Sequence, residues 1–377
     1  MAKHPVVVYG ASGYTGMLIM DWLIDQQIPF TAIARNAKRA HEMMAQRVVR
    51  LESATYEIIE TEHNVDALVA AFKRAKVVCN TVGPFVNFGL TTIEASLKVG
   101  CHYLDTTGEQ GHLLDARERF DQPYREAGLL LSPSVAYMYT FWEIAAELAL
   151  ETPGVDVLET VTLCRSPRGG ASGVTVGSTA SIFEMYRRDA FYLWEKQLLQ
   201  HPFGASINAV DPSFAQPVFS LPWGGTSLPV YFERDARVRS CMSHVGFYDN
   251  NVMQTVHALG KKWQEEFKDL PRQYQDAVLK QFVDSTTPSM PPRERTTTHR
   301  TVDFAIGRGQ LAAVRATVHG ITPYIATGAL QTAAVVKLLD GDTRTVGFAS
   351  PSKAFGHRYL LGFLEQRGLA RATVQPL

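Results

Sequence analysis

A glycine-rich segment near the start of the sequence has residue types and a spacing that suit phosphate binding. Gly10-Ala11-Ser12-Gly13-Tyr14-Thr15-Gly16 follows the apolar run Val6–Tyr9 and precedes apolar residues at helical spacing. Glycine tolerates the backbone angles of a tight turn and lets backbone N–H groups approach a pyrophosphate closely. Because the loop joins a strand to a helix, its GxxGxxG spacing predicts a dinucleotide site. The residues expected to bind are Gly10, Ser12, Gly13, Tyr14, Thr15 and Gly16.

The end of the next predicted strand indicates which dinucleotide binds. An NAD site usually has Asp or Glu here, which bonds the ribose 2′-hydroxyl. This sequence instead reads Ala34-Arg35-Asn36-Ala37-Lys38-Arg39 and has no acid in reach. Arg35 can hold a 2′-phosphate with two parallel hydrogen bonds, and Lys38 and Arg39 add positive charge. The turn, Asn36 included, therefore favours NADP(H), and a solvated basic turn without a ligand is the alternative.

These residues need a sheet to position them, and the first 150 residues alternate between strands and helices. Short apolar runs predict strands at 6–9, 30–34, 56–59, 77–79, 102–105 and 129–131. Asn64 can cap one of the intervening helices. Thr91 and Glu94 fit a capping box for another, which ends at Lys98 and Gly100. Strands separated by helices imply parallel pairing, so the fold class is α/β, with an N-terminal Rossmann doubly wound parallel sheet.

The length of 377 residues suits two or three lobes. We expect an NADP-binding Rossmann domain over 1–150, an α+β substrate domain over 151–320, and C-terminal helices over 321–377 that return to the Rossmann domain. The sequence of the second half predicts a strand over 157–164, a long helix over 181–200 and a Pro- and Gly-rich loop over 202–229. Two helices follow over 252–267 and 272–282, then a hairpin over 301–318. Two helices over 324–339 and 352–366 close the chain.

Four segments together resemble the saccharopine dehydrogenase-like oxidoreductases, a family that includes saccharopine reductases and trans-acting enoyl reductases. They are the loop Gly10–Gly16, the turn Ala34–Asn36, Asn80-Thr81-Val82-Gly83-Pro84-Phe85, and His102-Tyr103-Leu104-Asp105-Thr106-Thr107-Gly108-Glu109. Ala349–Gly356 is similar to the family's C-terminal segment.

The resemblance implies two further parts of the site. Asn80, Thr81, Val82, Gly83 and Pro84 would run beside the ribose and nicotinamide of the cofactor, and Asp105, Thr107, Gly108 and Glu109 would form part of the wall. Both segments follow the carboxyl ends of strands, where open α/β sheets bind ligands. One segment departs from the family. Relatives of the enoyl reductase type tend to have a Gly-Phe-Asp-Ser-like turn where this chain has Pro133–Thr140, so the resemblance does not identify the substrate.

For proton delivery the candidates are Tyr137 and Tyr139, which follow the sixth strand, and then Lys353. Packing at a domain interface is the alternative role of the two tyrosines. Tyr192 and Lys196 match the YxxxK spacing of short-chain dehydrogenases, but such a match is expected by chance in this composition. Cys79 and Cys101 flank cofactor-side strands, and buried, inert thiols are the favoured interpretation.

These residues predict an NADPH-dependent reductase that acts on an activated C=C bond of a fairly apolar small molecule. Imine reduction, or a saccharopine-type amino-acid dehydrogenase, is the alternative enzyme. Such a substrate carries several carboxylates and needs convergent arginines, for which the second half offers Arg165, Arg168, Arg187, Arg188, Arg234, Arg237 and Arg239. A non-catalytic NADP(H) sensor is the alternative from another class.

The composition excludes several other classes of protein. Lys+Arg and Asp+Glu are equal at 37 each, which gives no reason to expect nucleic acid as a partner. No apolar run is long enough for a transmembrane helix, and no secretory signal precedes Val6. The four cysteines have no metal-ligand spacing, so we expect no metal and a cytoplasmic protein. Assembly into a homodimer is left open.

Overall fold

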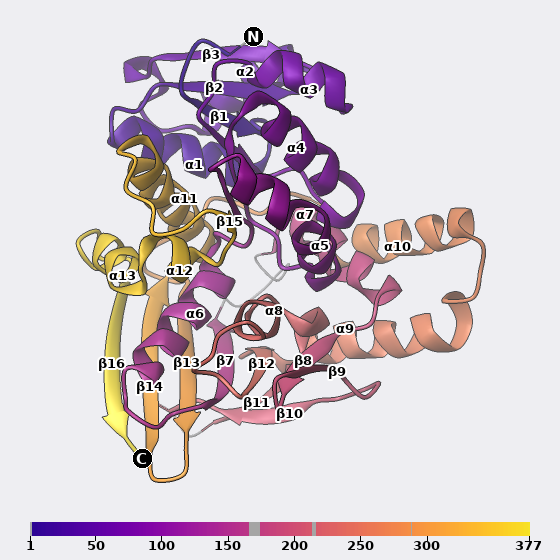
Figure 1. The fold of residues 1–377 in the computed structure, drawn as a ribbon. Helices are drawn as coiled ribbons and strands as arrows, with labels where there is room; N and C mark the ends of the chain where they lie inside the picture. Colours follow the sequence, from indigo (N-terminus) through magenta and orange to yellow (C-terminus); the bar gives the residue numbers. More distant parts are fainter. Residues whose placement is uncertain (1, 166–173, 213–215, 288) are drawn as a thin grey trace. The chain divides into compact units, whose positions relative to one another are not determined.

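The computed structural model describes residues 2–165, 174–212, 216–287 and 289–377 (Figure 1). These residues form two compact units. Unit 1 comprises Met1–Thr107, His112–Thr140 and Tyr324–Arg367, and unit 2 comprises Gly108–Gly111, Phe141–Pro323 and Gly368–Leu377. Each unit is therefore built from segments that are far apart in the sequence.

Unit 1 contains a seven-stranded, all-parallel sheet in the order β15-β6-β5-β4-β1-β2-β3. The order reverses beside β1, which lies between β2 and β4, and this confirms the predicted doubly wound Rossmann sheet. The strands are β1 (Val6–Tyr9), β2 (Phe30–Ala34), β3 (Tyr56–Glu60), β4 (Val77–Asn80), β5 (His102–Asp105), β6 (Leu130–Ser132) and β15 (Gly347–Phe348).

Helices alternate with these strands, as predicted. They are α1 (Tyr14–Asp25), α2 (Ala37–Arg47), α3 (Val65–Phe72), α4 (Phe85–Val99), α5 (Gln110–Glu126), α6 (Tyr137–Leu150), α11 (Pro323–Leu339), α12 (Pro351–Phe355) and α13 (His357–Glu365). The predicted capping box is wrong, because α4 already begins at Phe85. Glu94 lies inside the helix and pairs with Lys98 at 2.7 Å. Gly100, at φ +82°, ends the helix as predicted.

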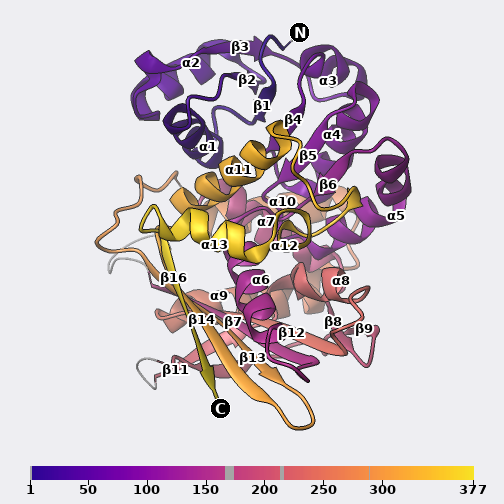
Figure 2. The same ribbon diagram turned by 60° about the vertical axis from the view of Figure 1, so that its left-hand side comes forward.

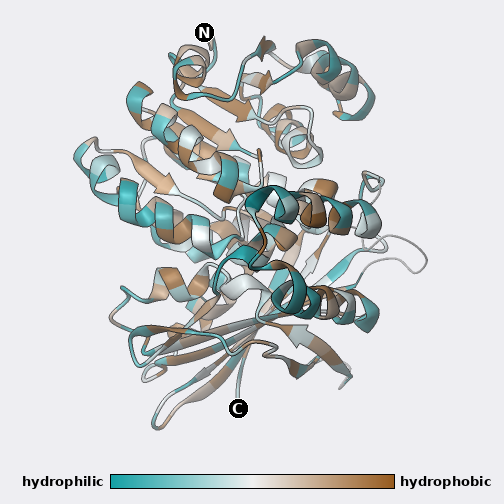
Figure 3. Cartoon of the chain, turned by 90° about the vertical axis from the view of Figure 1, so that its right-hand side faces the viewer, coloured by the Kyte–Doolittle hydropathy of each residue, from teal (hydrophilic) through white to brown (hydrophobic). Residues whose placement is uncertain are grey.

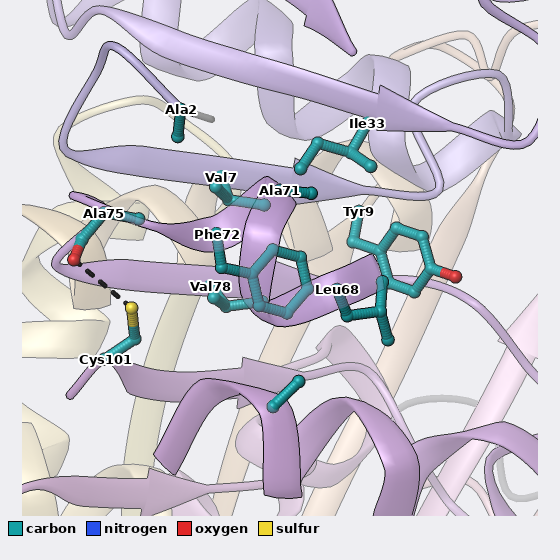
Figure 4. Close-up of a cluster of buried hydrophobic side chains, with 11 residues drawn as sticks. Ala2, Val7, Tyr9, Ile33, Leu68, Ala71, Phe72, Ala75, Val78 and Cys101 are labelled. Carbon is teal, nitrogen blue, oxygen red and sulfur yellow. Dashed lines mark hydrogen bonds between the residues drawn. The ribbon is translucent and has the colours of Figure 1, made fainter. Parts of the chain in front are cut away.

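The core on one face of this sheet joins strands to α3 (Figure 4). Val7, Ile33 and Val78 from the strands pack with Leu68 and Phe72 from the helix. In Figure 3 the strands of unit 1 are mostly brown, the hydrophobic colour, whereas its helices carry teal as well as brown. This difference fits strands covered on both faces and helices with one solvated side.

Two cysteines belong to the interior of unit 1. The Cys101 thiol donates to the Ala75 carbonyl oxygen at 3.2 Å (Figure 4), and burial raises its pKa to about 12. Burial also raises the pKa of Cys79 well above its usual range. Because the thiolate is the nucleophile, these thiols are inert packing groups, as the sequence favoured.

Unit 2 is built on a mixed sheet in the order β10-β11-β12-β7-β13-β14-β16, with the β8–β9 hairpin paired to β12. Among the described strands of this sheet, only β7 and β12 are parallel neighbours. Figures 1 and 2 show β13, β14 and β16 side by side. The strands are β7 (Val157–Arg165), β8 (Phe191–Trp194), β9 (Gln197–Gln200), β10 (Ile207–Val210), β11 (Pro217–Leu221), β12 (Ser240–Phe247), β13 (Arg300–Arg308), β14 (Ala313–Ile321) and β16 (Ala370–Pro376).

The helical part of unit 2 includes α7 (Val176–Glu184), α8 (Leu228–Phe232), α9 (Asn250–Lys262) and α10 (Arg272–Thr286). The helix α9 continues as a π-helical segment, Trp263–Phe267, and α10 packs against α7. Three predictions for this half are wrong. The helix expected over 181–200 stops at Glu184 and is followed by the β8–β9 hairpin. The stretch expected as a loop contains β10, β11 and α8, and the chain closes with β16 instead of a helix.

No helix among the described residues is long and apolar enough to cross a membrane.

Candidate coenzyme site

The loop between β1 and α1 is packed so tightly that glycine is needed at two of its positions. Gly10 has φ +95°, and a Cβ added there would lie 2.4 Å from Thr81 Oγ1. A Cβ on Gly16 would lie 2.5 Å from the Gly10 carbonyl oxygen. The turn closes through a hydrogen bond from the Gly13 N–H to the Gly10 carbonyl at 2.9 Å. The loops that follow β1 and β4 therefore touch at the point where the strand order reverses, the usual ligand site of such sheets.

The N-terminus of α1 is open in the way that a bound phosphate requires. Its N-cap residue is Gly13, no side chain of the described residues caps it, and no acid lies in its first turn. The first N–H groups of a helix have no partner within the helix, and the helix dipole favours negative charge there. The loop and this helix end together fit a pyrophosphate.

In the basic turn after β2, two side chains hold the backbone, and Arg35 is exposed. Asn36 Oδ1 accepts from the Arg39 N–H at 2.7 Å, so Asn36 caps α2. Glu60 accepts from the Ala37 N–H at 2.8 Å. The side chains of Arg35, Lys38 and Arg39 are all exposed. Asn36 thus has a structural role, and the positive charges that surround it remain accessible.

A pocket of about 470 Å³ lies beside Arg35. Its other lining residues come from β3, from the turn after β3 and from α3. They are Ile59, Glu60, Thr61, Glu62, Ala67, Ala70 and Ala71, and the small side chains of the three alanines on α3 leave room for the pocket. None of these residues was predicted from the sequence to line the site. The signal that could have found them is their position, because they follow the carboxyl end of β3, the neighbour of β2.

His63 lies in the same turn and was also missed. Its Nδ1 lies 2.8 Å from the Tyr9 hydroxyl, its ring is parallel to the Tyr9 ring with centroids 6.0 Å apart, and its edge meets Phe88 at 5.1 Å between centroids. Burial, with a smaller contribution from the positive charge of Arg35, lowers the pKa of His63. Burial raises the pKa of Tyr9 to about 12. Both side chains are therefore uncharged at neutral pH, and they form a flat wall near Arg35.

The segments after β4 and β5 are joined by a buried network centred on Asp105. One carboxylate oxygen accepts from the N–H groups of Thr107 and Ser134, each at 2.9 Å. The other accepts from the Tyr103 hydroxyl at 3.0 Å and lies 3.3 Å from His112 Nε2. Because both oxygens are already bonded within the unit, the carboxylate positions the loops after β5 and β6. A direct contact between Asp105 and a coenzyme stays a prediction.

Asn80 extends this network to the glycine loop. Its amide donates to the Tyr103 hydroxyl at 2.9 Å and its oxygen accepts from the Val82 N–H at 2.9 Å. Thr81 donates to the Tyr9 carbonyl at 2.9 Å. The next peptide bond, between Gly83 and Pro84, is cis. Thr81 and Val82 thus lie next to Gly10. That residues 80–84 run beside the ribose and nicotinamide of a coenzyme stays a prediction.

The remaining predicted residues are more scattered. Thr107 is buried in unit 1, whereas Gly108 and Glu109 belong to unit 2. Tyr137, whose N–H donates to Thr327 Oγ1 at 3.0 Å, is buried, and Tyr139 is half-buried; both lie in the first turn of α6. The Tyr14 ring packs edge-on against Tyr324 at 5.2 Å between centroids.

Lys353 lies at the edge of the sheet, and its role in proton delivery stays a prediction. It is exposed on α12, which follows β15 at the edge of the sheet. With a strand spacing of about 4.8 Å, β15 lies about 14 Å from β4, its third neighbour. The YxxxK pair also fails, because Tyr192 lies in β8 and Lys196 donates to the Asp235 carbonyl at 2.6 Å from the following turn. A catalytic Tyr–Lys pair is therefore absent at these two positions.

Comparison with known proteins agrees with this geometry. Residues 6–131 match the saccharopine dehydrogenase NADP binding domain. The solved structure of apo saccharopine dehydrogenase (L-Glu forming) from Saccharomyces cerevisiae matches with a TM-score of 0.61 at 10% identity, over 99% of this chain and 100% of that one. This likeness shows that the fold is shared over the whole length.

Curated relatives match parts of the chain. A trans-acting enoyl reductase from Mycobacterium ulcerans is 28% identical over 60% of this chain and 56% of its own. A second one, from Mycobacterium bovis, is 33% identical over 33% of this chain and 29% of its own. A lipid droplet localized protein from Caenorhabditis elegans is 26% identical over 34% of this chain and 32% of its own. The chain thus spans at most a little over half the length of these relatives.

The predicted resemblance is confirmed for the N-terminal part, which is an NADP-binding domain of the saccharopine dehydrogenase type. The model of a family of unknown function, DUF5938, matches residues 140–376. That range covers more than half of the sequence, and we conclude that the chain belongs to the DUF5938 family.

Proposed function

We propose that the protein is an NADP(H)-dependent oxidoreductase that reduces an activated C=C bond in a fairly apolar small molecule. The observation that carries the proposal is the open N-terminus of α1. There Gly10 presses against Thr81 at the carboxyl ends of β1 and β4, and Arg35 stands exposed at the end of β2. The names of the relatives, trans-acting enoyl reductases, support the kind of bond.

In this proposal the backbone N–H groups of residues 10–16 bind the pyrophosphate, and Arg35 binds the 2′-phosphate, with Lys38 and Arg39 adding charge. Residues 81–84 orient the ribose and nicotinamide. When bound, NADPH supplies a hydride. The protein's own contribution is to hold the coenzyme, to exclude water and to deliver a proton, for which we propose Tyr139 or Tyr137, with Lys353 a more remote candidate.

The arginines of unit 2 support an apolar substrate over a saccharopine-like one. Arg187 pairs with Glu184 and Asp276, Arg237 with Glu147 and Asp235, and Arg239 with Asp156 and Glu195. Arg165 stacks on the Tyr248 ring at 4.6 Å. Arg168 lies outside the described residues. Arg188 and Arg234 are not free either. Because the described guanidinium groups already have partners, they are poorly suited to bind several substrate carboxylates.

The test is a fluorescence titration of the protein with NADPH and with NADH. We expect a preference for NADPH. Loss of two charge-assisted hydrogen bonds in Arg35→Ala should weaken NADPH binding about 10- to 100-fold and leave NADH binding unchanged. Arg47→Ala, an exposed change at the other end of α2, is the matched control. Equal affinity for the two coenzymes in the unmodified protein would contradict the role of Arg35.

Activity is then measured as NADPH oxidation with enone, enoyl and imine compounds. Turnover of an enone or enoyl compound is the expected result, whereas turnover of imines alone would favour the amino-acid dehydrogenase. Tight NADPH binding without turnover would favour a sensor. A cytoplasmic location and a homodimer remain proposals from the sequence.

A further inference from the structure

Unit 2 contains a second pocket, of about 320 Å³, made entirely from its own residues. Its walls come from the end of α7, from residues 200–205 after β9, from the turn after β11, and from α9 with its π-helical extension. The apolar and aromatic part of the lining consists of Ile182, Met185, Tyr186, Phe203, Leu221, Trp223 and Val256. The size is at the lower end of ligand pockets and suits about a dozen non-hydrogen atoms.

One wall of this pocket has an unusual backbone. Trp223, Gly224, Gly225 and Thr226 are four consecutive residues with positive φ, at +49°, +65°, +86° and +61°. A bulky residue such as Trp rarely adopts this conformation, and such segments cluster at functional sites. A Cβ on Gly224 would lie 2.4 Å from Met185 Sδ, so only glycine lets the turn approach Met185 so closely.

A second irregular segment, distant in sequence, lines the same pocket. The π-helical turn Trp263–Phe267 contributes Gln264, and Lys268 follows directly after it. Single π-helical turns inside α-helices are rare and frequent at functional sites. Gly260, one turn earlier, allows the Tyr186 ring to lie 3.4 Å from where its Cβ would be. Two unrelated departures from regular structure thus shape one cavity.

The charged groups of the lining favour an anion. Asp189 carries one negative charge, and its carboxylate accepts from the Gln200 amide at 2.8 Å. Arg188 and Lys268 carry positive charge, and no carboxylate among the described residues pairs with the Lys268 ammonium group. Burial and the neighbouring His244 lower the pKa of His201 to about 4, so this imidazole is neutral at pH 7. The lining is therefore largely apolar, and its two cationic side chains outnumber its one carboxylate.

We propose that this pocket binds a small apolar carboxylic acid, with its apolar body against Trp223 and Met185 and its carboxylate at Lys268. Arg188, which also lines the pocket, adds to the positive field. The inference rests on unit 2 alone and does not depend on the proposed reductase activity.

The experiment is isothermal titration calorimetry of the full chain with 4-phenylbutanoate and with its neutral counterpart, 4-phenylbutan-1-ol. We expect saturable binding of the acid at one site. Lys268→Gln should weaken binding of the acid about three- to fivefold and leave binding of the alcohol unchanged. Val256→Phe, which fills the cavity, should weaken both by about tenfold or more. Lys261→Gln, an exposed change on the same helix outside the lining, should have no effect.

Circular dichroism and thermal melting of each variant separate loss of binding from loss of folding, and Lys268→Gln alters only an exposed side chain. Arg35→Ala should bind the acid like the unmodified protein, which keeps this site distinct from the coenzyme site. The proposal is overturned if the acid gives no saturable heat, if a folded Val256→Phe variant binds as before, or if Lys268→Gln affects acid and alcohol equally.

Discussion

At the scale of single residues, Gly10 and Gly100 share a left-handed backbone but differ in their surroundings. Gly10 has φ +95° and Gly100 has φ +82°. A Cβ on Gly10 would press on Thr81, whereas nothing lies within 4 Å of a Cβ on Gly100. Alanine at Gly100 therefore meets only the conformational penalty, while alanine at Gly10 also displaces the loop after β4.

We expect Gly100→Ala to lower the free energy of unfolding by roughly 1–2 kcal/mol, and Gly10→Ala by about twice as much. Gly10→Ala should also weaken NADPH binding, because the loop and Thr81 shift together, and Gly100→Ala should not. Thermal melting and NADPH titration of the two variants measure this. Equal melting temperatures and equal affinities would show that the contact between Gly10 and Thr81 has no consequence.

Tyr139 is the residue on which we base proton delivery, because it is half-buried whereas Tyr137 is buried. Tyr139→Phe removes the hydroxyl and keeps the ring. We expect kcat to fall about 10²- to 10⁴-fold with the Kd for NADPH unchanged. Tyr274→Phe, at an exposed position on α10, is the control. An unchanged kcat would remove Tyr139 from the mechanism and direct the same test to Tyr137.

His201 and His244 make stability depend on pH. Their rings lie 6.5 Å apart, and burial lowers the pKa of each to about 4 from 6.5, helped at His201 by the charge of His244. Between pH 6.5 and about 4 the unfolded chain binds protons that the folded chain does not, so stability falls as pH falls through this window. Above pH 6.5 these two residues cause no change.

The measurement is the midpoint of urea unfolding at a series of pH values from 7.5 to 4.5. It compares the unmodified protein with a double variant that carries both His201→Gln and His244→Gln. The loss of stability below pH 6.5 should be smaller in the double variant. If both proteins lose stability with the same slope, the two histidines are not its source.

At the scale of elements, the sequence predicted the strands of unit 1 well because their side chains leave little choice. Val6–Tyr9 and Phe30–Ala34 are fully buried, as a parallel strand covered on both faces requires, and Gly10 and Arg35 follow them directly. The glycine loop was therefore predictable, together with the position of Arg35. The pocket near α3 was not predicted, because its lining combines residues from the end of β2, from β3 and from α3 that only the folded unit brings together.

There is a physical reason why residues 181–200, predicted as one long helix, instead form the end of α7 and the β8–β9 hairpin. The aromatic residues of this region fit a helix as easily as a strand, and the deciding feature is the turn at Glu195 and Lys196. Both adopt positive φ, at +47° and +66°, which joins β8 to β9. Neither residue type signals such a turn. The contact between β8 and β12 that holds the hairpin is between residues far apart in sequence, and no window of sequence contains it.

At the scale of the whole molecule, unit 1 is completed by a segment from the far end of the chain. Gln331 on α11 donates to the carbonyl oxygens of Asp105 at 2.9 Å and Val135 at 2.8 Å. Trp22 donates to the Ile325 carbonyl at 3.0 Å. A Cβ on Gly328 would lie 2.6 Å from the Leu18 carbonyl oxygen, so α11 packs closely on α1. These contacts fix the helix that bears the glycine loop and the strand end that carries Asp105.

We therefore expect a fragment of residues 1–150 to fold poorly, because it leaves the carbonyls of Asp105 and Val135 without Gln331 and exposes the apolar surface that α11 covers. It should bind a hydrophobic dye and melt without cooperativity, as a molten globule does. Residues 1–140 joined by a Gly/Ser linker to 324–367 should melt cooperatively and bind NADPH. A cooperative transition of 1–150 alone, within a few degrees of the fusion, would contradict this, since α11 would then add packing without being needed for the fold of the coenzyme site.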